Sequence, residues 1–280
     1  MIKVDEKIVE INKFPDGTPR INLDVDELGT YFPNGIKIDW KYENDGEMFY
    51  LMLIKRHLEE HLPSDIDVEL FLPYVPNARM DRTKNADEVF TLKYFCDFIN
   101  SLGFSNVYVL DPHSDVSVAL LNGCVVLTPE KYIRDVFHSM EATNNVVLYF
   151  PDSSAAKRYS ELFPNIPYCY GEKKRDWKTG KILGLDVRTN GIDLSGKTIL
   201  MIDDIVSYGG SLFYSAEELK KYNPYKIYAY ATHTENSVLD KEKGTLIKAL
   251  ENNTVERLFT TNSLFTGEHE KITVMEVLGE

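Results

Sequence analysis

The feature that most constrains the fold is a regular alternation of short apolar runs with longer segments of helical periodicity. Runs typical of buried strands occupy residues 68–72, 107–110, 146–150, 198–202 and 227–231. Helical spacing of apolar residues is found in residues 48–62, after an expected cap at Asn44-Asp45, and in residues 88–101, 129–140, 155–162 and 212–222. This alternation predicts an α/β fold in which mainly parallel sheets are covered by helices.

The strand and helix series occurs twice along the 280 residues. The first series ends near Met140, and residues 141–145 (EATNN) have the polar composition of a linker before an apolar run begins at Val146. Because domains commonly contain about 100–150 residues, two domains are the economical arrangement. We expect an N-terminal domain over residues 1–140 and a C-terminal domain over residues 141–280.

Composition and charge narrow the classes of partner. Lys and Arg number 31 against 44 Asp and Glu, a net charge of −13, which disfavours binding to duplex nucleic acid. The first residues, MIKVDEKIVEINKF, interleave charged with apolar side chains, unlike a signal peptide or a membrane span. The three cysteines, Cys96, Cys124 and Cys169, are widely separated, as expected of reduced thiols. We expect a cytoplasmic protein that binds neither nucleic acid nor membranes.

Three polar segments directly follow expected strands, where open α/β sheets bind their ligands. They are DPH (111–113), PDSS (151–154) and DDIVSYGGS (203–211). Taken singly, His113 has the alternative of a hydrogen-bonded turn residue and Asp152 that of a helix cap. The adjacent carboxylates of Asp203 and Asp204 repel each other unless a cation or hydroxyl donors lie between them, so this pair favours a ligand site.

The third segment suits a ligand that carries both hydroxyls and a phosphate. Backbone N–H groups of residues 208–211, at the start of an expected helix, would form an anion-binding nest. The two upstream carboxylates would accept hydrogen bonds from vicinal hydroxyls. Ribose 5-phosphate has both features at this spacing. The predicted ribose-phosphate site comprises Asp203, Asp204, Ser207, Tyr208, Gly209, Gly210 and Ser211.

Residues 203–211 resemble the ribose-phosphate loop of type I phosphoribosyltransferases, and the chain from about residue 11 to 265 resembles the ribose-phosphate pyrophosphokinase (PRPP synthetase) family. Further segments that resemble this family follow in its order: FPDG (14–17), ND (44–45), PYVPNARMDR (73–82), DPH (111–113), PDSSAAKR (151–158), EKKR (172–175) and ATH (231–233).

The resemblance implies two stacked type I phosphoribosyltransferase-like domains, with ATP and the ribose phosphate bound between them. It implies an Mg²⁺-dependent transfer of the β,γ-diphosphate of ATP to an anomeric hydroxyl, with release of AMP. The implied ATP-binding residues are Arg79, Asp81, Arg82 and, from a neighbouring subunit, Phe14 and Asp16, so a homo-oligomer is expected. The implied catalytic residues are Lys173, Arg175 and His113, and the implied metal ligands are His113 and Asp152. Without the resemblance, Lys173 and its neighbours would be interpreted as a solvated basic loop.

The chain departs from the family pattern at several points. Ser207 and Tyr208 replace an Asp-Thr pair, Thr18 stands where a carboxylate is usual, and Ser153-Ser154 replaces a Gly pair. Residues 234–237 (TENS) replace an expected Phe-Ser-Gly segment.

Tyr208 bears on the identity of the acceptor. Its side chain is too long to close on a terminal phosphate as a small hydroxyl residue does, and its ring could stack on a base. We therefore expect the acceptor to be ADP-ribose, giving ADP-ribose 1-diphosphate for NAD salvage. The alternative is free ribose 5-phosphate, which gives PRPP.

Two other functions remain open. A phosphoribosyltransferase would keep the 203–211 loop but would not need residues 79–82 or a second domain. A non-catalytic regulatory partner would be expected to have lost residues such as Lys173 or Asp152, and both are present.

Overall fold

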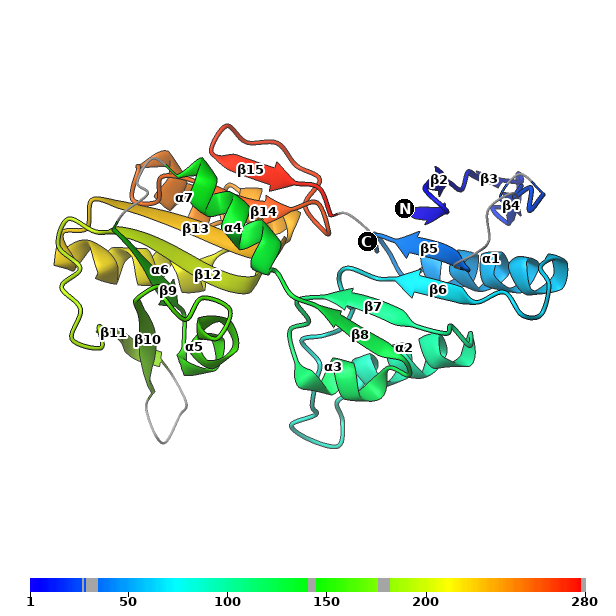
Figure 1. The fold of residues 1–280 in the computed structure, drawn as a ribbon, viewed down its shortest axis with the longest axis horizontal. Coiled ribbons are helices and arrows are strands. Elements are labelled where there is room, and N and C mark those ends of the chain that lie inside the picture. Colours follow the sequence, from blue (N-terminus) through cyan, green and yellow to red (C-terminus); the bar gives the residue numbers. More distant parts are fainter. Residues whose placement is uncertain (27, 29–34, 141–144, 176–181, 278–280) are drawn as a thin grey trace. The chain divides into compact units, whose positions relative to one another are not determined.

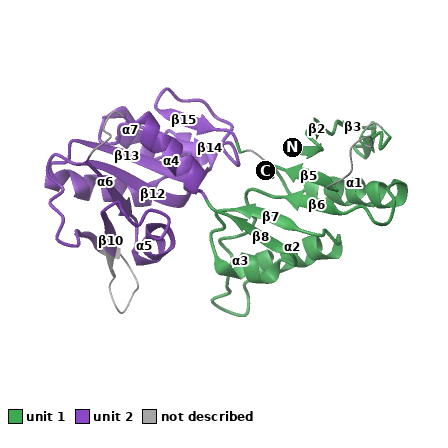
Figure 2. Ribbon diagram, viewed as in Figure 1, with its two compact units in different colours: residues 1–128, 277–280 green, residues 129–276 purple. Residues whose placement is uncertain are grey.

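The computed structural model describes residues 1–26, 28, 35–140, 145–175 and 182–277, with the backbone alone at 173–175, 182 and 183. These residues form two compact units, residues 1–128 with Val277 and residues 129–276 (Figure 2). The division lies before helix α4 (Glu130–Ser139), whereas the sequence-based boundary at 140/141 lies after it. Residues 141–144 of the predicted linker lie outside the described residues.

The first unit is built on a mainly parallel six-stranded sheet in the order β2-β1-β5-β6-β7-β8. Its strands are β1 (Ile2–Val4), β2 (Lys7–Ile8), β5 (Ile36–Trp40), β6 (Val68–Phe71), β7 (Val107–Leu110) and β8 (Cys124–Leu127). Strands β5 to β8 are parallel, and β1 is antiparallel to both of its neighbours. A separate hairpin consists of β3 (Ile11–Lys13) and β4 (Pro19–Ile21).

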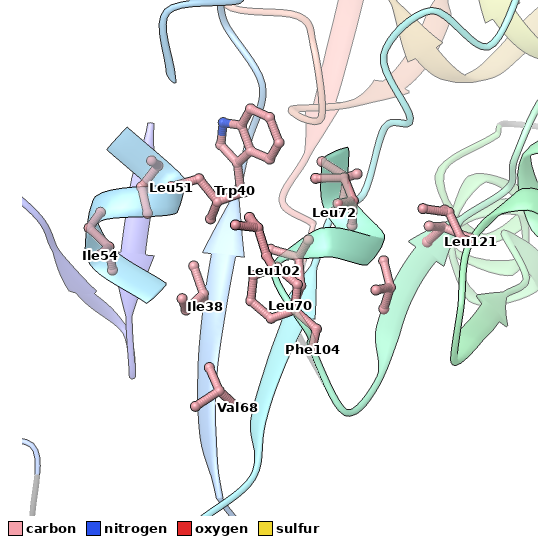
Figure 3. Close-up of a cluster of buried hydrophobic side chains, with 14 of the residues drawn as sticks. Ile38, Trp40, Leu51, Ile54, Val68, Leu70, Leu72, Leu102, Phe104 and Leu121 are labelled. Carbon is pink, nitrogen blue, oxygen red and sulfur yellow. The ribbon is translucent and has the colours of Figure 1, made fainter. Parts of the chain in front are cut away.

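Helices α1 (Glu47–His61), α2 (Thr91–Ser101) and α3 (Asp115–Leu120) connect strands that follow one another across this sheet. Since such crossovers are right-handed, all three helices belong to one face of the sheet. Figure 3 shows the resulting core, in which Ile38 and Trp40 of β5 lie beside Leu51 and Ile54 of α1. The opposite face bears the partly exposed side chains of Lys37 and Asp39 and others.

Helix α1 begins later than the sequence pattern suggested. Its cap position is Gly46, without a capping side chain, and Asn44 Oδ1 instead accepts a hydrogen bond of 3.0 Å from Gly46 N. Asp45 accepts from the Tyr42 hydroxyl. The expectation that Asn44-Asp45 caps the helix was therefore wrong, because these side chains bond within the preceding turn.

The second unit is built on a seven-stranded sheet in the order β11-β10-β9-β12-β13-β14-β15 (Figure 1). Its strands are β9 (Val146–Phe150), β10 (Tyr168–Arg175), β11 (Ile182–Arg188), β12 (Thr198–Val206), β13 (Lys226–Thr234), β14 (Leu258–Thr261) and β15 (Ile272–Met275). All neighbouring pairs are parallel except β10 with β11. Besides α4, the helices are α5 (Ser153–Ser160), α6 (Gly210–Leu219) and α7 (Leu246–Glu251), with 3₁₀ turns η1 (Lys220–Tyr222) and η2 (Asn236–Leu239).

In this second sheet, the chain connections run in opposite directions on the two sides of the β9–β12 pair. The chain passes from β9 through α5 to β10 on one side, and from β12 through α6 to β13 on the other. Right-handed connections in opposite directions place α5 and α6 on opposite faces. The carboxyl ends of β9 and β12 therefore form a topological switch point, where α/β proteins bind ligands.

The structure confirms an α/β fold with mainly parallel sheets. Strands β7 and β9 have the predicted bounds, whereas β12 and β13 extend beyond theirs to Val206 and Thr234. Among the described residues, every helix is too short or too polar to cross a bilayer.

Candidate functional site

Three carboxylates gather at the switch point of the second unit. Pairing between β9 and β12 ends at Tyr149 and Met201, whereas β12 continues beside β13 as far as Val206. Asp203 and Asp204 therefore lie within β12, on a stretch that β9 no longer covers. Asp152 follows the end of β9, and its charge is close enough to influence the Asp203 carboxyl.

Asp203 and Asp204 belong to opposite faces of the sheet, because successive strand residues alternate. Asp203 shares the face of Met201, which belongs to the core that includes helix α6. Asp204 lies on the α5 face, where its Oδ2 is 3.8 Å from Arg158 Nη1. The pair can thus interact with both sides of a ligand placed across the strand end.

The surroundings of Asp203 disfavour the ionised form of its carboxyl group. Its enclosure by protein raises its pKa well above the ordinary value, and the charges of Asp204 and Asp152 raise it further. Asp203 Oδ1 accepts a hydrogen bond of 3.0 Å from Asp204 N. Hydroxyl donors or a cation at this position would favour the ionised form.

Asp152 also has the structural role considered from the sequence. Its Oδ1 accepts hydrogen bonds of 3.0 Å from Ser154 N and from Ala155 N, and so caps helix α5. This arrangement fixes the carboxyl group at the carboxyl end of β9. Ser153 and Ser154, which depart from the family pattern, form the first turn of this helix.

The glycine-containing loop connects the end of β12 to α6, as expected. Gly209 has φ +83°, a left-handed conformation that suits glycine, and Gly210 begins the helix. No side chain caps this helix, so the backbone N–H groups of its first turn, at Gly210 and Ser211, have the arrangement of an anion site. Ser207 is partly exposed, and Tyr208 is 39% exposed. The structure thus brings the predicted phosphate-loop residues beside the carboxylate pair.

Lys173 and Arg175 lie on the β10–β11 hairpin and not in a loop. Lys173 pairs with Leu185 and Arg175 with Ile182, with an irregularity between Lys174 and Arg175. The side chains of residues 173–175 lie outside what the structure describes, as do residues 176–181 entirely. The alternative of a solvated loop therefore does not hold for the backbone of residues 173–175, because antiparallel pairing satisfies it through Arg175.

An ion pair and a close packing contact fix the part of this hairpin that precedes Lys173. Glu172 and Arg188 form a charge-assisted ion pair across the two strands. Gly171 packs so closely on the end of β9 that an added Cβ would lie 2.4 Å from the Tyr149 hydroxyl and 2.8 Å from the Pro151 carbonyl oxygen. The strand that carries Lys173 is thereby joined to the strand that precedes Asp152.

In the first unit, the expected nucleotide segment and the DPH segment meet at one sheet edge. They follow neighbouring strands β6 and β7, and Leu110 N donates a 3.1 Å hydrogen bond to Pro73 O. Arg82 is 84% exposed, and its Nε is 3.9 Å from Asp81 Oδ1. Asp111 is buried with φ +43°, and His113 is partly exposed. Arg79, Asp81, Arg82 and His113 thus belong to loops at the carboxyl ends of parallel strands.

The FPDG segment forms the tip of the β3–β4 hairpin. Phe14 N donates to Thr18 O, and Asp16 Oδ1 accepts from Thr18 N at 3.0 Å and from Thr18 Oγ1 at 2.7 Å. These bonds lower the pKa of Asp16. Phe14 is 48% exposed at the hairpin tip. Thr18, which stands where the family usually has a carboxylate, thus orders the turn that exposes Phe14.

Two contributors to the site were not singled out from the sequence. Arg158 stands in a matched segment, but only the structure places it beside Asp204. Thr245, whose backbone and side chain contact the phosphate loop, carried no sequence signal. Neither relationship has a fixed spacing along the chain that a motif could capture.

The two predicted metal ligands, His113 and Asp152, are not brought together within one unit. In the described part of the chain, no group of three or more His, Cys, Asp and Glu side chains is arranged to hold a metal ion. The two predicted ligands belong to different units, His113 to the first and Asp152 to the second. Their joint role as a metal site stays a prediction.

Known proteins resemble this chain in sequence and in fold. The model of the phosphoribosyl transferase domain family matches residues 113–259, about half of the chain. The ribose-phosphate pyrophosphokinase of Thermococcus kodakarensis is 26% identical over 230 residues, covering 80% of this chain and 77% of that protein. The enzyme of the same name from Sulfolobus acidocaldarius is 25% identical over 281 aligned residues, covering 99% and 89%.

A solved structure has a similar fold over most of the length. It is the phosphoribosylpyrophosphate synthetase from Mycobacterium smegmatis, with a TM-score of 0.71 and 18% identity, covering 96% of this chain and 86% of that one. At this identity the likeness concerns the fold alone.

Proposed function

Because the chain belongs to the phosphoribosyl transferase domain family and, within it, to the ribose-phosphate pyrophosphokinases, we propose that it transfers the β,γ-diphosphate of ATP to the anomeric hydroxyl of ribose 5-phosphate, with release of AMP. The observation that carries this proposal is the meeting of a carboxylate pair and a glycine-containing phosphate loop at one switch point.

The acceptor would bind across the end of β12. Asp203 and Asp204 would accept hydrogen bonds from the ribose hydroxyls, which relieves the repulsion between the carboxylates. The backbone N–H groups of Gly209, Gly210 and Ser211 would bind the 5-phosphate. This arrangement leaves the anomeric hydroxyl at the end of the ribose away from the phosphate.

Diphosphate transfer depends mainly on positioning and on neutralisation of phosphate charge. We assign the neutralising role to Lys173 and Arg175 on β10, and the binding of ATP to Arg79, Asp81 and Arg82 of the first unit. Phe14, exposed at its hairpin tip, and Asp16 would complete the ATP site of a neighbouring subunit in a homo-oligomer. His113 is proposed to act in catalysis.

Mg²⁺ fits the oxygen donors of the second unit. It is commonly held by one or two carboxylates together with the phosphates of a substrate, so a cluster of three protein ligands is not required. Asp152 and the Asp203–Asp204 pair supply carboxylates of this kind. When bound, the ion would neutralise phosphate charge on ATP.

A second candidate acceptor, ADP-ribose, is favoured by one observation. The side chain of Tyr208, a residue of the phosphate loop, is 39% exposed, and Lys243 Nζ lies 6.0 Å from the centroid of its ring. The second phosphate and the adenosine of ADP-ribose would therefore meet a cation and an aromatic surface. The relatives, named as ribose-phosphate pyrophosphokinases, favour free ribose 5-phosphate instead, and we adopt that acceptor.

Acceptor competition tests the choice. We expect AMP release with a kcat/KM for ribose 5-phosphate more than tenfold that for ADP-ribose, a difference of about 1.4 kcal/mol in transition-state binding. A preference for ADP-ribose would replace the first candidate with the second. Absence of AMP with either acceptor would leave the phosphoribosyltransferase and non-catalytic alternatives.

A further inference from the structure

We infer that residues 235–246 form a positioning element for the phosphate loop, with Thr245 as its central positioning residue. The inference rests on the proposed function, which assigns this loop to the 5-phosphate of the acceptor. It concerns a segment whose beginning departs from the family pattern, as the loop itself does.

The main connection is made at the Tyr208 carbonyl oxygen. This atom accepts three hydrogen bonds, at 2.8 Å from Thr245 N, at 2.9 Å from Thr245 Oγ1 and at 3.2 Å from Leu246 N. Because a trans peptide is planar, its C=O and N–H point in opposite directions. Holding the Tyr208 carbonyl toward α7 therefore directs the Gly209 N–H away from α7.

Contacts on both sides of this peptide strengthen the connection. A Cβ built on Gly209 would lie 2.2 Å from Leu246 Cβ, so only glycine allows this close approach. Ser207 Oγ is 3.1 Å from Ser237 Oγ, which in turn is 3.1 Å from Glu235 Oε2. Three consecutive loop residues are thus held by one segment.

The consequence is a preorganised anion nest. An N–H group that is already oriented loses little conformational entropy when phosphate binds, so fixing it raises affinity for the acceptor. The loop binds the end of the acceptor remote from the transferred group. Loosening it should therefore weaken acceptor binding and leave the chemical step largely unchanged.

Thr245→Val tests this inference, since it keeps the side-chain shape and removes the hydroxyl donor. We expect the Kd for ribose 5-phosphate, measured by calorimetry, and its KM to rise about fivefold, the size of one net hydrogen bond. The kcat and the KM for ATP should stay within about twofold. Thr245→Ser, which keeps the hydroxyl, should bind the acceptor like the wild type.

Thr254→Val is the matched control. Thr254 lies beyond the other end of α7, and its Oγ1 accepts from Lys220 Nζ at 3.3 Å. This variant should keep the acceptor Kd of the wild type.

An unchanged Kd in Thr245→Val, or a lowered kcat with an unchanged KM, would overturn the inference, as would a wild type that fails to bind ribose 5-phosphate. If the wild type binds this acceptor but releases no AMP, the proposed function fails. The calorimetric comparison still decides the inference in that case, because binding requires no turnover.

Discussion

The Tyr149 hydroxyl donates a hydrogen bond of 2.8 Å to Ser215 Oγ in the buried interior of the second unit. Burial raises the pKa of Tyr149, so the hydroxyl keeps its proton. Tyr149 lies on β9, which leads to Asp152, and Ser215 lies on α6, which begins at the phosphate loop. Gly171 of β10 packs against the same hydroxyl. One buried bond therefore joins β9 to α6, and β10 packs against it, so the three elements that carry the proposed acceptor and diphosphate sites meet at Tyr149.

Gly171→Ala should disturb this junction. The added Cβ would lie 2.4 Å from the Tyr149 hydroxyl, so we expect a loss of about 1–3 kcal/mol in the free energy of unfolding, together with reduced kcat. Denaturant unfolding and steady-state assays measure the two effects.

Gly184→Ala is the matched control, because Gly184 lies on β11 of the same hairpin and an added Cβ would meet no atom of the described side chains and backbone within 4 Å. Its unfolding free energy should change by less than about 0.5 kcal/mol. Equal effects of the two substitutions would show that Gly171 has no special packing role.

The Asp203 pKa predicts a pH-dependent cost to stability. A carboxyl whose pKa is raised in the folded state lowers stability as the pH rises from about its ordinary value, 3.8, through its folded pKa. Asp203→Asn should therefore raise the Tm of the ligand-free protein at neutral pH and have little effect near pH 4. Acceptor binding should be lost at the same time.

Asp135→Asn, at an exposed position on α4, should leave the Tm unchanged at both pH values. A lower Tm for Asp203→Asn at neutral pH would contradict the assigned cost of the carboxylate.

Lys173→Ala tests the proposed neutralisation of the transferred group. Loss of a cation at developing phosphoryl charge should lower kcat by about 10²- to 10³-fold, while circular dichroism and Tm stay close to those of the wild type. Lys221→Ala, at a residue whose side chain is 66% exposed and pairs with Glu218, is the control and should retain full turnover. Near-normal turnover of Lys173→Ala would return the basic segment to the role of a solvated surface.

A mixing experiment tests the proposed oligomer. If Phe14 completes the ATP site of a neighbouring subunit, Phe14→Ala and Lys173→Ala should each be weakly active alone. Dissociation and reassembly of the two variants together should restore part of the activity, because some sites then receive an intact residue from each chain. A shared site would be refuted if the activity of the mixture equals the sum of the two separate variants. It would also be refuted if the wild type is fully active at a concentration where light scattering shows a monomer.

Much of the fold could be predicted because buried parallel strands are nearly continuous apolar runs. Residues 107–110 and 146–150 have this character and form β7 and β9. Strand β5 was missed because its residues, IKIDW, alternate between buried and partly exposed positions. Residues 173–175 were expected in a loop because the strand they form, at the antiparallel edge of the sheet, is highly charged.

The candidate site was predictable where its residues are neighbours in sequence. Asp203, Asp204 and the glycines of the loop follow one strand, so a single segment showed both carboxylates and the nest. The bond between Thr245 and Tyr208 joins residues 37 positions apart, and that between Tyr149 and Ser215 joins residues 66 apart. Such contacts depend on tertiary packing, which no local pattern records.

Transfer of an intact diphosphate is tested most directly with labelled ATP. The full-length protein would be incubated with Mg²⁺, ribose 5-phosphate and ATP labelled in both its β- and γ-phosphates, and the products separated and counted. We predict that AMP and the labelled acceptor form in equal amounts, with both labelled phosphates on the acceptor. Formation of ADP with a single labelled phosphate on the acceptor, or no transfer of label, would contradict the account.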